Sequence, residues 1–246
     1  MCALGIALLL GTQRGDVLQW FGGWHPRGGV AVGVDFAAGP FAAGMVALSG
    51  GLVCVALLYS WTYLAEAVAL VDTLMLVCCG AMAGFALSGD LFNLFVWLEL
   101  MGVAAYALTG FEVRRIEPVQ GAVNFAITNT VGGVLLLVGI ALLYARTGAL
   151  NLAQIGRTIA QQPKGGVVIV ALTLIVCGFL SKAAVVPFNL WLSDAYAVAP
   201  IPVCAIFAGL MTDIGLFGVA RVYWTVFDGQ FGTQQRYVGD VLLWLG

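Results

Sequence analysis

The strongest constraint in this sequence is a series of long apolar runs, each about the length of a membrane-spanning helix. A spanning helix needs about 20 mostly apolar residues, because the hydrocarbon layer of a bilayer is about 30 Å thick. Runs of this kind cover residues 37–59, 68–88, 91–110, 119–143, 166–190 and 201–226. The sequence therefore predicts an all-α integral membrane protein, a multi-span helix bundle.

The composition supports the same fold class and excludes several others. Of the 246 residues, 62% are hydrophobic and only 9% are charged, whereas a soluble domain carries about 25% charged residues. A disordered chain needs low hydrophobicity and high charge, so it is excluded too. Ten Lys and Arg against twelve Asp and Glu give a net charge of −2, which offers no basic face for nucleic acid. We expect a multi-pass protein of a bacterial cell membrane.

The two ends of the chain are apolar but too short to span. Met1–Gly11 lacks the basic segment and the small-residue cleavage site of a signal peptide, so we interpret it as the end of a truncated helix. A last apolar run starts near Val238, and we interpret it as the start of a further helix. The predicted organisation is a truncated helix plus a β-hairpin-like loop over 1–36, followed by a transmembrane bundle over 37–246.

Two connections have their own patterns. Val17–Phe21 and Val30–Val34 flank a segment rich in Gly and Pro, which predicts a short β-hairpin outside the bilayer. Leu152, Ile155 and Ile159 share one helical face among polar residues, which predicts an amphipathic helix at the membrane interface.

Three charged residues fall near the middle of apolar runs: Glu99, Lys182 and Asp213. A charge at the bilayer centre costs about 2.5–3.5 kcal/mol on the translocon insertion scale, so such groups face a bundle interior or a water-filled path. Glu99 and Lys182 are natural partners, and each can change its protonation state when its surroundings change. We predict a proton relay through these residues; the structural alternative is a static buried ion pair that fixes helix packing.

Pro187 lies five residues after Lys182, within the same apolar run. Proline removes one intrahelical hydrogen bond and crowds the carbonyl of Ala183, so the helix should kink or break just past the lysine. Broken helices at membrane depth occur where they line a cavity or are buried in protein, and transporters use them for ion sites. An ordinary proline kink is the alternative.

Weaker polar signals complete the candidate site. Asn124 and Thr128 share a helix face, and with Asn189 they form a candidate polar path. They can equally hydrogen-bond to neighbouring helices. The six cysteines lie in apolar runs, His25 is the single histidine, and no C-x-x-C is present, so we expect neither a metal site nor a cofactor in this chain.

Two long motifs carry a resemblance to a known family. Residues 88–99 read SGDLFNLFVWLE, and residues 178–183 read GFLSKA, followed by WLSDA at 191–195. These stretches resemble the proton-pumping membrane subunits: the antiporter-like subunits of respiratory complex I (NADH:quinone oxidoreductase), their relatives in membrane-bound hydrogenases, and the A-type and D-type subunits of Mrp sodium/proton antiporters. The segment LYARTGALNL at 143–152 is similar to a connection of the same family.

The resemblance implies the first half of an inverted-repeat antiporter-like fold, with a repeat core at about 68–226. It implies that Glu99 takes the position of the family's essential glutamate, and Lys182 that of the lysine on the broken helix. It also implies that redox centres lie on other subunits, so this chain has no redox chemistry of its own. Other membrane subunits are the expected partners, and protons, or sodium ions, the expected cargo.

The sequence departs from the family pattern at several positions. Asp213 stands where the family usually has lysine or histidine, which reverses a charge and suggests a tighter ion pair with Lys182. Asn189 and Tyr196 stand where histidines are often found, so no imidazole relay is present. The second repeat lies outside this sequence.

Two arguments give opposite membrane orientations. The positive-inside rule places the loops richer in Arg and Lys in the cytoplasm, whereas the family topology places them outside. The residues on that side are Arg14, Arg27, Arg146, Arg157, Lys164 and Arg236, against Arg114 and Arg115 on the other.

The leading functional prediction is a proton-translocating membrane subunit of a complex I-like or hydrogenase-like oxidoreductase, working through a buried Glu/Lys relay. One alternative is the D-type subunit of an Mrp Na+/H+ antiporter. A second is a scaffold subunit that does not conduct, which the aspartate at 213 favours.

Overall fold

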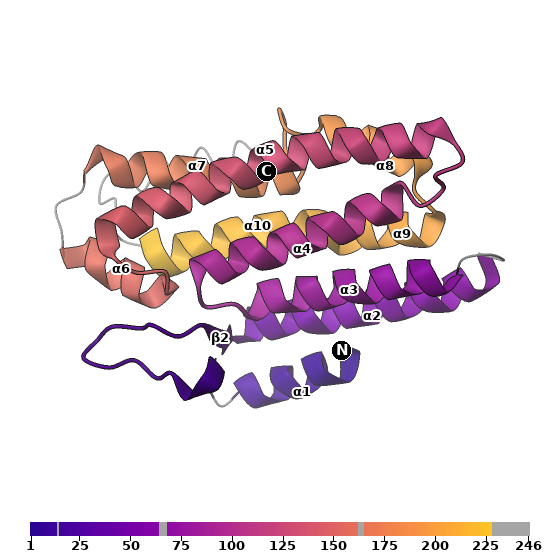
Figure 1. Ribbon diagram of the computed structural model, residues 1–246. Helices are drawn as coiled ribbons and strands as arrows, with labels where there is room; N and C mark the ends of the chain where they lie inside the picture. The colour runs from indigo at the N-terminus through magenta and orange to yellow at the C-terminus, as the bar shows by residue number, and fades with distance from the viewer. Residues whose placement is uncertain (14, 64–67, 162–164, 228–246) are drawn as a thin grey trace.

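The computed structural model describes residues 1–13, 15–63, 68–161 and 165–227, and these form a bundle of apolar helices (Figure 1). The predicted further helix from Val238 lies outside the described residues. The helices in chain order are α1 (Cys2–Thr12), α2 (Pro40–Tyr63), α3 (Val68–Leu87), α4 (Leu91–Thr109), α5 (Ile116–Thr147), α6 (Leu152–Gln161), α7 (Gly166–Lys182), α8 (Leu190–Val198), α9 (Ile201–Ile206) and α10 (Thr212–Val222).

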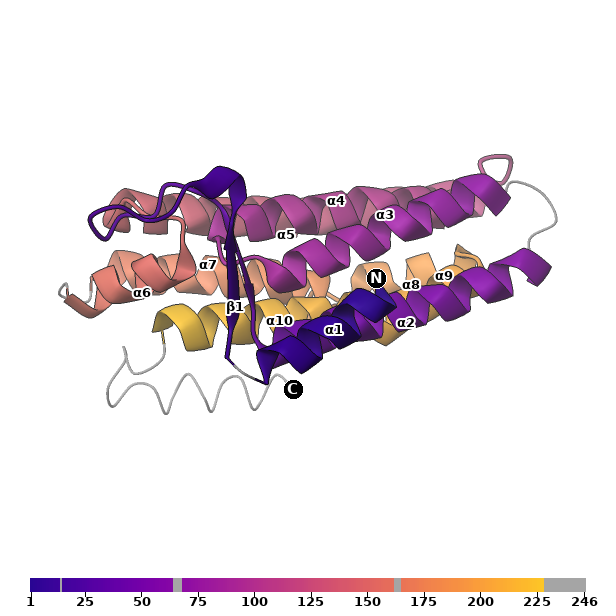
Figure 2. The same ribbon diagram turned by 90° about the horizontal axis from the view of Figure 1, so that it is seen from below.

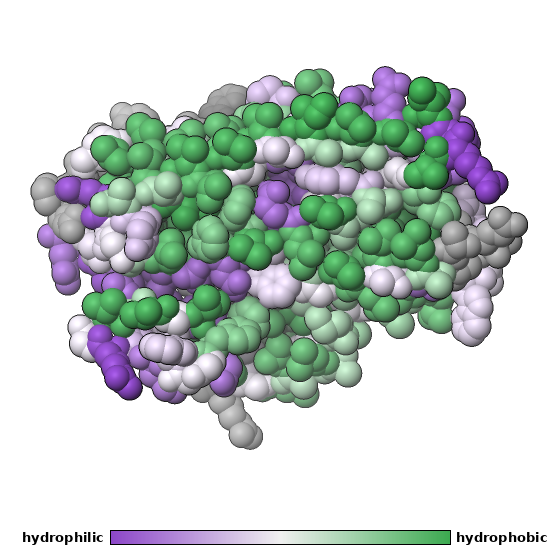
Figure 3. Space-filling view, viewed as in Figure 1, coloured by the Kyte–Doolittle hydropathy of each residue, from purple (hydrophilic) through white to green (hydrophobic). Residues whose placement is uncertain are grey.

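Among the described residues, five helices are long and apolar enough to cross a membrane: α2, residues 69–87 of α3, α4, α5, and a rod over Ile201–Phe227. This rod joins α9 and α10 through two wider π-helical stretches, η2 (Phe207–Met211) and η3 (Tyr223–Phe227). Hydrophobic residues cover most of the middle of the face in Figure 3, around small hydrophilic patches, and further hydrophilic residues gather towards its two ends. The predicted all-α membrane bundle is confirmed.

The predicted span over 166–190 is interrupted. α7 ends at Lys182 and α8 begins at Leu190, so the intervening chain is not helical. The predicted break is therefore present, and its place agrees with the constraint that Pro187 puts on the helix. The Val186–Pro187 peptide bond is cis.

A two-stranded ribbon crosses one end of the bundle (Figure 2). β1 (Val17–Trp20) pairs in antiparallel fashion with β2 (Asp35–Ala38). The first predicted strand agrees with β1, but a strand over Val30–Val34 is wrong. Gly28 and Gly29, both with positive φ, make a tight turn that Arg27 and Val30 close. The valine run after that turn continues as loop, and Val32 is 79% exposed.

The predicted amphipathic helix is α6. Its apolar positions Leu152, Ile155 and Ile159 are buried, whereas Arg157 is exposed. Gly156 lies directly on η3, because a β-carbon there would come within 2.7 Å of the carbonyl oxygen of Thr225.

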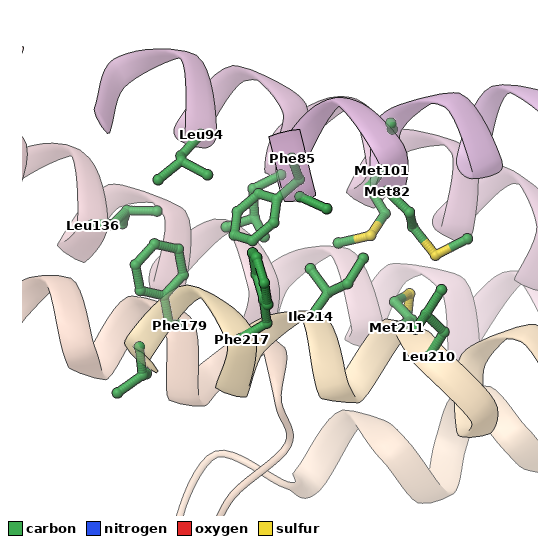
Figure 4. Close-up of a cluster of buried hydrophobic side chains, with 14 of the residues drawn as sticks. Met82, Phe85, Leu94, Met101, Leu136, Phe179, Leu210, Met211, Ile214 and Phe217 are labelled. Atoms are coloured by element: carbon green, nitrogen blue, oxygen red, sulfur yellow. The ribbon is translucent and has the colours of Figure 1, made fainter. Parts of the chain in front are cut away.

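Buried aromatic side chains fill the bundle between α3, α7 and α10. Phe85 packs edge-on against Phe179 at a centroid distance of 5.9 Å and lies 6.2 Å from Phe217. Leu94 and Leu136 lie beside these rings, and Met82, Met101, Met211 and Ile214 continue the cluster along α10 (Figure 4). The three aromatic rings lie on the β2 side of the break after α7, and the methionines continue the cluster past the level of Lys182.

Candidate functional site

Glu99 is placed by α4, whose start is fixed by a side-chain cap. The carboxylate of Asp90 accepts a hydrogen bond from the backbone N–H of Asn93 at 2.9 Å, which is the arrangement of a helix N-cap. Nine residues later, the half-buried Glu99 faces α5. Gly133 of α5 leaves the space that this carboxylate fills, since a β-carbon at Gly133 would overlap Glu99 Oε1.

Lys182 is the last residue of α7, and it is 3% exposed. Its ammonium lies 5.8 Å from the ring centroid of Tyr106 and 5.7 Å from that of Phe125. A β-carbon at Gly102 would be 3.3 Å from Lys182 Nζ, so the missing side chain of Gly102 makes room for the ammonium. A cation over aromatic faces is stabilised by about 0.5–2 kcal/mol.

The structure brings Glu99 and Lys182 to the same face of α4, because Glu99 and Gly102 are one turn apart. They do not form a contact ion pair. Among the described residues, no carboxylate oxygen lies within 4.0 Å of Lys182 Nζ, and none accepts a hydrogen bond from it. The aromatic rings, and not a carboxylate, are the direct neighbours of this charge. Within the part of the chain that the structure describes, the ammonium therefore has no ion-pair partner fixed beside it.

The break after α7 is stabilised by specific backbone contacts. Ala184 has a positive φ of 54°, which turns the chain out of the helix. Trp191 is fully buried, and its indole N–H donates to the Ser181 carbonyl at 3.0 Å. This bond satisfies a carbonyl at the end of α7, where helical partners are missing. Trp191 also stacks on Phe125 at 4.1 Å, so the break and the ring beneath Lys182 support each other.

A series of polar groups follows α5 towards the break. Asn124 donates to Asp194 of α8 at 2.8 Å, and Thr128 Oγ1 donates to the Asn124 carbonyl at 3.0 Å. The hydroxyl of Ser181, the residue before Lys182, donates to the Thr128 carbonyl at 3.5 Å. Asn124 and Thr128 line one open pocket of about 210 Å³, together with Ile127, Leu190, Trp191 and Asp194.

Two predicted site residues lie apart from this arrangement. Asn189 is exposed at the start of α8 and does not line the pocket. Asp213 is exposed on α10, and among the described residues it forms no ion pair. The suggested tight pair between Asp213 and Lys182 is therefore absent from this structure. Asp213 faces outwards because its neighbours Ile214 and Gly215 occupy the buried side of α10.

Sequence reasoning missed five members of the site: Tyr106, Phe125, Ser181, Trp191 and Asp194. Helical spacing was an available signal for two of them. Tyr106 is seven residues after Glu99, two turns along the same face of α4. Asp194 is three residues after Trp191 on α8, so both side chains reach the same side. No pattern along the chain indicates that Phe125 and Trp191 stack.

A second polar cluster lies at the β2 end. The Asp35 carboxylate, 4% exposed, accepts a hydrogen bond from Asn151 at 3.0 Å. Gly89 donates its amide to the Asp35 carbonyl at 3.0 Å and accepts from Leu152 at 3.0 Å. Arg221 of α10 donates to the Ala37 carbonyl at 2.8 Å. Three segments far apart in sequence are thus tied together around Gly89.

Burial dominates the ionisation of both acids in this cluster. Removal from water raises the pKa of Asp35, and the negative charge of Asp90 adds to this, whereas the Asn151 hydrogen bond and the charge of Arg221 lower it. Burial likewise raises the pKa of Asp90, against the backbone hydrogen bonds that its carboxylate accepts.

Known proteins share the sequence and the fold of this chain. The family described as NADH:quinone oxidoreductase/Mrp antiporter, TM matches residues 88–238. The chain belongs to this family. The matched region contains Glu99, Lys182 and both halves of the broken helix.

Individual relatives come from both branches of the family. The chain is 34% identical to the NADH-quinone oxidoreductase subunit N of Desulforudis audaxviator, over 90% of this chain and 44% of the relative. It is 31% identical to the putative antiporter subunit mnhD2 of Staphylococcus haemolyticus, over 92% of this chain and 44% of the relative. The chain thus spans less than half the length of these curated relatives.

Solved structures show the same likeness. A chain of the membrane-bound sulfane sulfur reductase, an archaeal respiratory membrane complex, is similar with a TM-score of 0.84 and 28% identity, over 92% of this chain and 46% of that one. A chain of the Mrp complex from Dietzia sp. DQ12-45-1b gives a TM-score of 0.79 and 29% identity, over 93% and 42%. Both belong to multi-subunit membrane complexes.

Proposed function

We propose that this chain is the proton-translocating part of a membrane subunit in a complex I-like or hydrogenase-like oxidoreductase. The observation that carries the proposal is the environment of Lys182, a buried ammonium between two aromatic rings with no carboxylate of the described residues at ion-pair distance. A static ion pair would need such a partner. A relay needs a group that can lose its proton, and Glu99 lies one turn of α4 from Gly102, whose missing side chain makes room for the ammonium.

The surroundings of Lys182 differ between its two sides. Towards α8, hydroxyl and amide groups reach from Ser181 to the surface pocket. Towards the β2 end, Phe85, Phe179 and Phe217 fill the space, with Leu94 and Leu136 beside them (Figure 4). We infer that protons reach Lys182 from the α8 side and not through the aromatic cluster. For passage onward we propose Asp213, the remaining member of the predicted relay, which is exposed on α10.

The test replaces Lys182 by arginine and by alanine in the complete assembly. Arginine keeps the positive charge but does not release its proton, so we expect both variants to lose proton translocation while the complex still assembles. Glu99→Gln, which keeps the size of the side chain, should lower it as well. Proton flux is measured in sealed vesicles with a pH-sensitive dye, and assembly by native electrophoresis.

These variants separate the relay from a scaffold role. Normal flux in Lys182→Arg and Lys182→Ala with an intact complex would support a scaffold that does not conduct. If Lys182→Arg pumps normally and Lys182→Ala does not assemble, the lysine is a packing charge and the relay is wrong.

The second candidate function is that of the D-type subunit in an Mrp sodium/proton antiporter. The likeness to the Dietzia Mrp chain and the 31% identity to a putative antiporter subunit favour it. Sodium decides between the two: proton flux that needs sodium on the opposite side supports the antiporter, whereas flux driven by electron transfer without sodium supports the oxidoreductase.

A further inference from the structure

The pocket between α5 and α8 has one charged residue at its rim. Of its six lining residues, only Asp194 carries a charge, and this side chain is exposed. Asn124 binds one carboxylate oxygen, Oδ2, at 2.8 Å. The other oxygen accepts no hydrogen bond from the described residues. The amide therefore fixes the direction of the carboxylate and leaves one oxygen available to solvent.

Through Thr128, the pocket adjoins the hydrogen bond that links α5 to the residue before Lys182. Thr128 lines it, and the Thr128 carbonyl accepts the hydroxyl of Ser181. Ser181 is 1% exposed and directly precedes Lys182. A volume of about 210 Å³ has room for a few water molecules, because each takes up about 30 Å³ in the liquid. Ser181 does not line the pocket, and its hydrogen bond to Thr128 is the link between the pocket wall and the end of α7.

The other route inward is closed by aromatic packing. Trp191 forms the floor of the pocket and stacks on Phe125, over whose ring the Lys182 ammonium lies. Two stacked rings leave no space for water between them. A proton that enters the pocket is therefore led along the Thr128 and Ser181 side of the rings.

We propose that Asp194 is the proton-collecting group at the mouth of the path to Lys182, and that Asn124 is its positioning residue. This inference rests on the proposed proton translocation. In the step itself, the free carboxylate oxygen takes a proton from hydronium or from a buffer acid, so an O–H bond forms on Asp194 as the donor's bond breaks. The carboxylic acid then gives the proton to water in the pocket and returns to the ionised state.

The test compares Asp194→Asn with Asp194→Glu in the complete assembly in vesicles. In weakly buffered medium we expect Asp194→Asn to slow proton translocation by about tenfold, the lower range of what a positioned acid–base group contributes. Asp194→Glu retains a carboxylate and should stay within about twofold of the wild type. Adding a small mobile buffer such as imidazole should restore most of the flux in Asp194→Asn, because the buffer delivers protons in place of the lost carboxylate.

Two variants serve as controls. Glu112→Gln changes an exposed acid in the α4–α5 loop, at the same end of the bundle, whose described partner is Arg115; it should leave the flux unchanged. Asn124→Ala removes the donor and keeps the acid, so it should slow the flux by about threefold, less than the loss of the carboxylate itself.

Several results would overturn the assignment. Normal flux in Asp194→Asn excludes a collecting role, and lost flux that mobile buffer does not restore shows a structural one. Restoration by sodium instead of buffer would make the pocket a sodium entrance. If Asp194→Asn does not assemble, equal flux in wild type and Asn124→Ala in weak buffer is sufficient to reject the proposal. Normal flux in Asp194→Asn together with no flux in Lys182→Ala rejects the collecting role of Asp194 and keeps the proposed relay. Normal flux in Lys182→Ala rejects the relay itself.

Discussion

Two asparagine–aspartate hydrogen bonds of nearly equal length lie at opposite ends of the bundle. At the β2 end, Asn151 donates to Asp35 at 3.0 Å, and these residues are 7% and 4% exposed. At the α8 end, Asn124 donates to Asp194 at 2.8 Å, and the aspartate is exposed beside an open pocket. The chemistry is the same, and the difference is access to water.

That difference assigns the two pairs different work. A buried carboxylate that loses its donor keeps the full cost of its desolvation, so the Asp35 pair holds three chain segments together. An exposed carboxylate is solvated with or without its amide, so the Asp194 pair contributes little to stability and is free to exchange protons. We call the buried pair of Asp35 and Asn151 the clamp. The exposed pair of Asp194 and Asn124 is the proposed proton entrance.

The largest contrast should come from truncating the two asparagines. Asn151→Ala leaves Asp35 without its side-chain donor and removes the cap that Asn151 Oδ1 provides to the Gln154 amide at 3.1 Å. We expect a loss of about 2–4 kcal/mol in the free energy of unfolding. Asn124→Ala should change it by no more than about 0.5 kcal/mol, as for an ordinary surface site.

The measurement is the thermal midpoint of the purified assembly in detergent, with all variants at the same pH and ionic strength. Equal shifts for Asn151→Ala and Asn124→Ala would show that burial does not separate the two pairs.

Much of this comparison was accessible from the sequence, and part was not. Apolar length located the spans, and Pro187 beside Lys182 located the break, because both follow from local chain geometry. Glu99 and Lys182 were found because a charge within an apolar run needs protein or water around it. Each of these signals lies within one segment.

The remaining features depend on contacts between distant segments. Asp35 meets Gly89 and Asn151 only because β2 pairs with β1 in its observed register. The valine run at 30–34 led to a wrong prediction of the second strand. The outward direction of Asp213 depends on which side of α10 packs against α7. The rings around Lys182 come from α4 and α5, and no spacing within one helix predicts their meeting.

Gly89 offers the next largest effect. A β-carbon there would lie 2.5 and 2.6 Å from the two carboxylate oxygens of Asp35, whose position is fixed by Asn151. Gly89→Ala should therefore cost about 1–3 kcal/mol of stability through overpacking. The matched control is Gly80→Ala in α3, where nothing lies within 4 Å of the added carbon.

Helix propensity sets the expectation for that control. Alanine favours a helix over glycine by up to about 1 kcal/mol, so Gly80→Ala should be neutral or slightly stabilising in the same melting experiment. A thermal midpoint for Gly89→Ala at or above that of the wild type would mean that Asp35 can move aside for the added carbon.

The clamp should also make stability depend on pH. Burial raises the pKa of Asp35 in the folded state, so the fold binds this proton more tightly than the unfolded chain does. The contribution to stability is complete below the unfolded pKa of about 3.9 and falls as the pH rises through the higher folded value. In Asp35→Asn this contribution to the change of stability with pH should disappear.

Thermal melting of the wild type and of Asp35→Asn between pH 4 and pH 7 tests the direction of this pH dependence. The wild type should lose stability relative to the variant as the pH rises through this window. A wild type that gains stability relative to Asp35→Asn towards pH 7 would contradict a burial-dominated carboxyl.

The smallest effect is expected at Asn189, a polar residue next to the break but outside the pocket. Its side chain is exposed and makes no hydrogen bond to the described residues, so Asn189→Ala should change stability by no more than about 0.5 kcal/mol. Proton translocation should be unchanged as well, because Asn189 does not line the pocket beside Asp194. A clear drop in flux for Asn189→Ala, with Thr128→Val unaffected, would place the entrance on the outer side of α8 and reverse the functions assigned to these two polar positions.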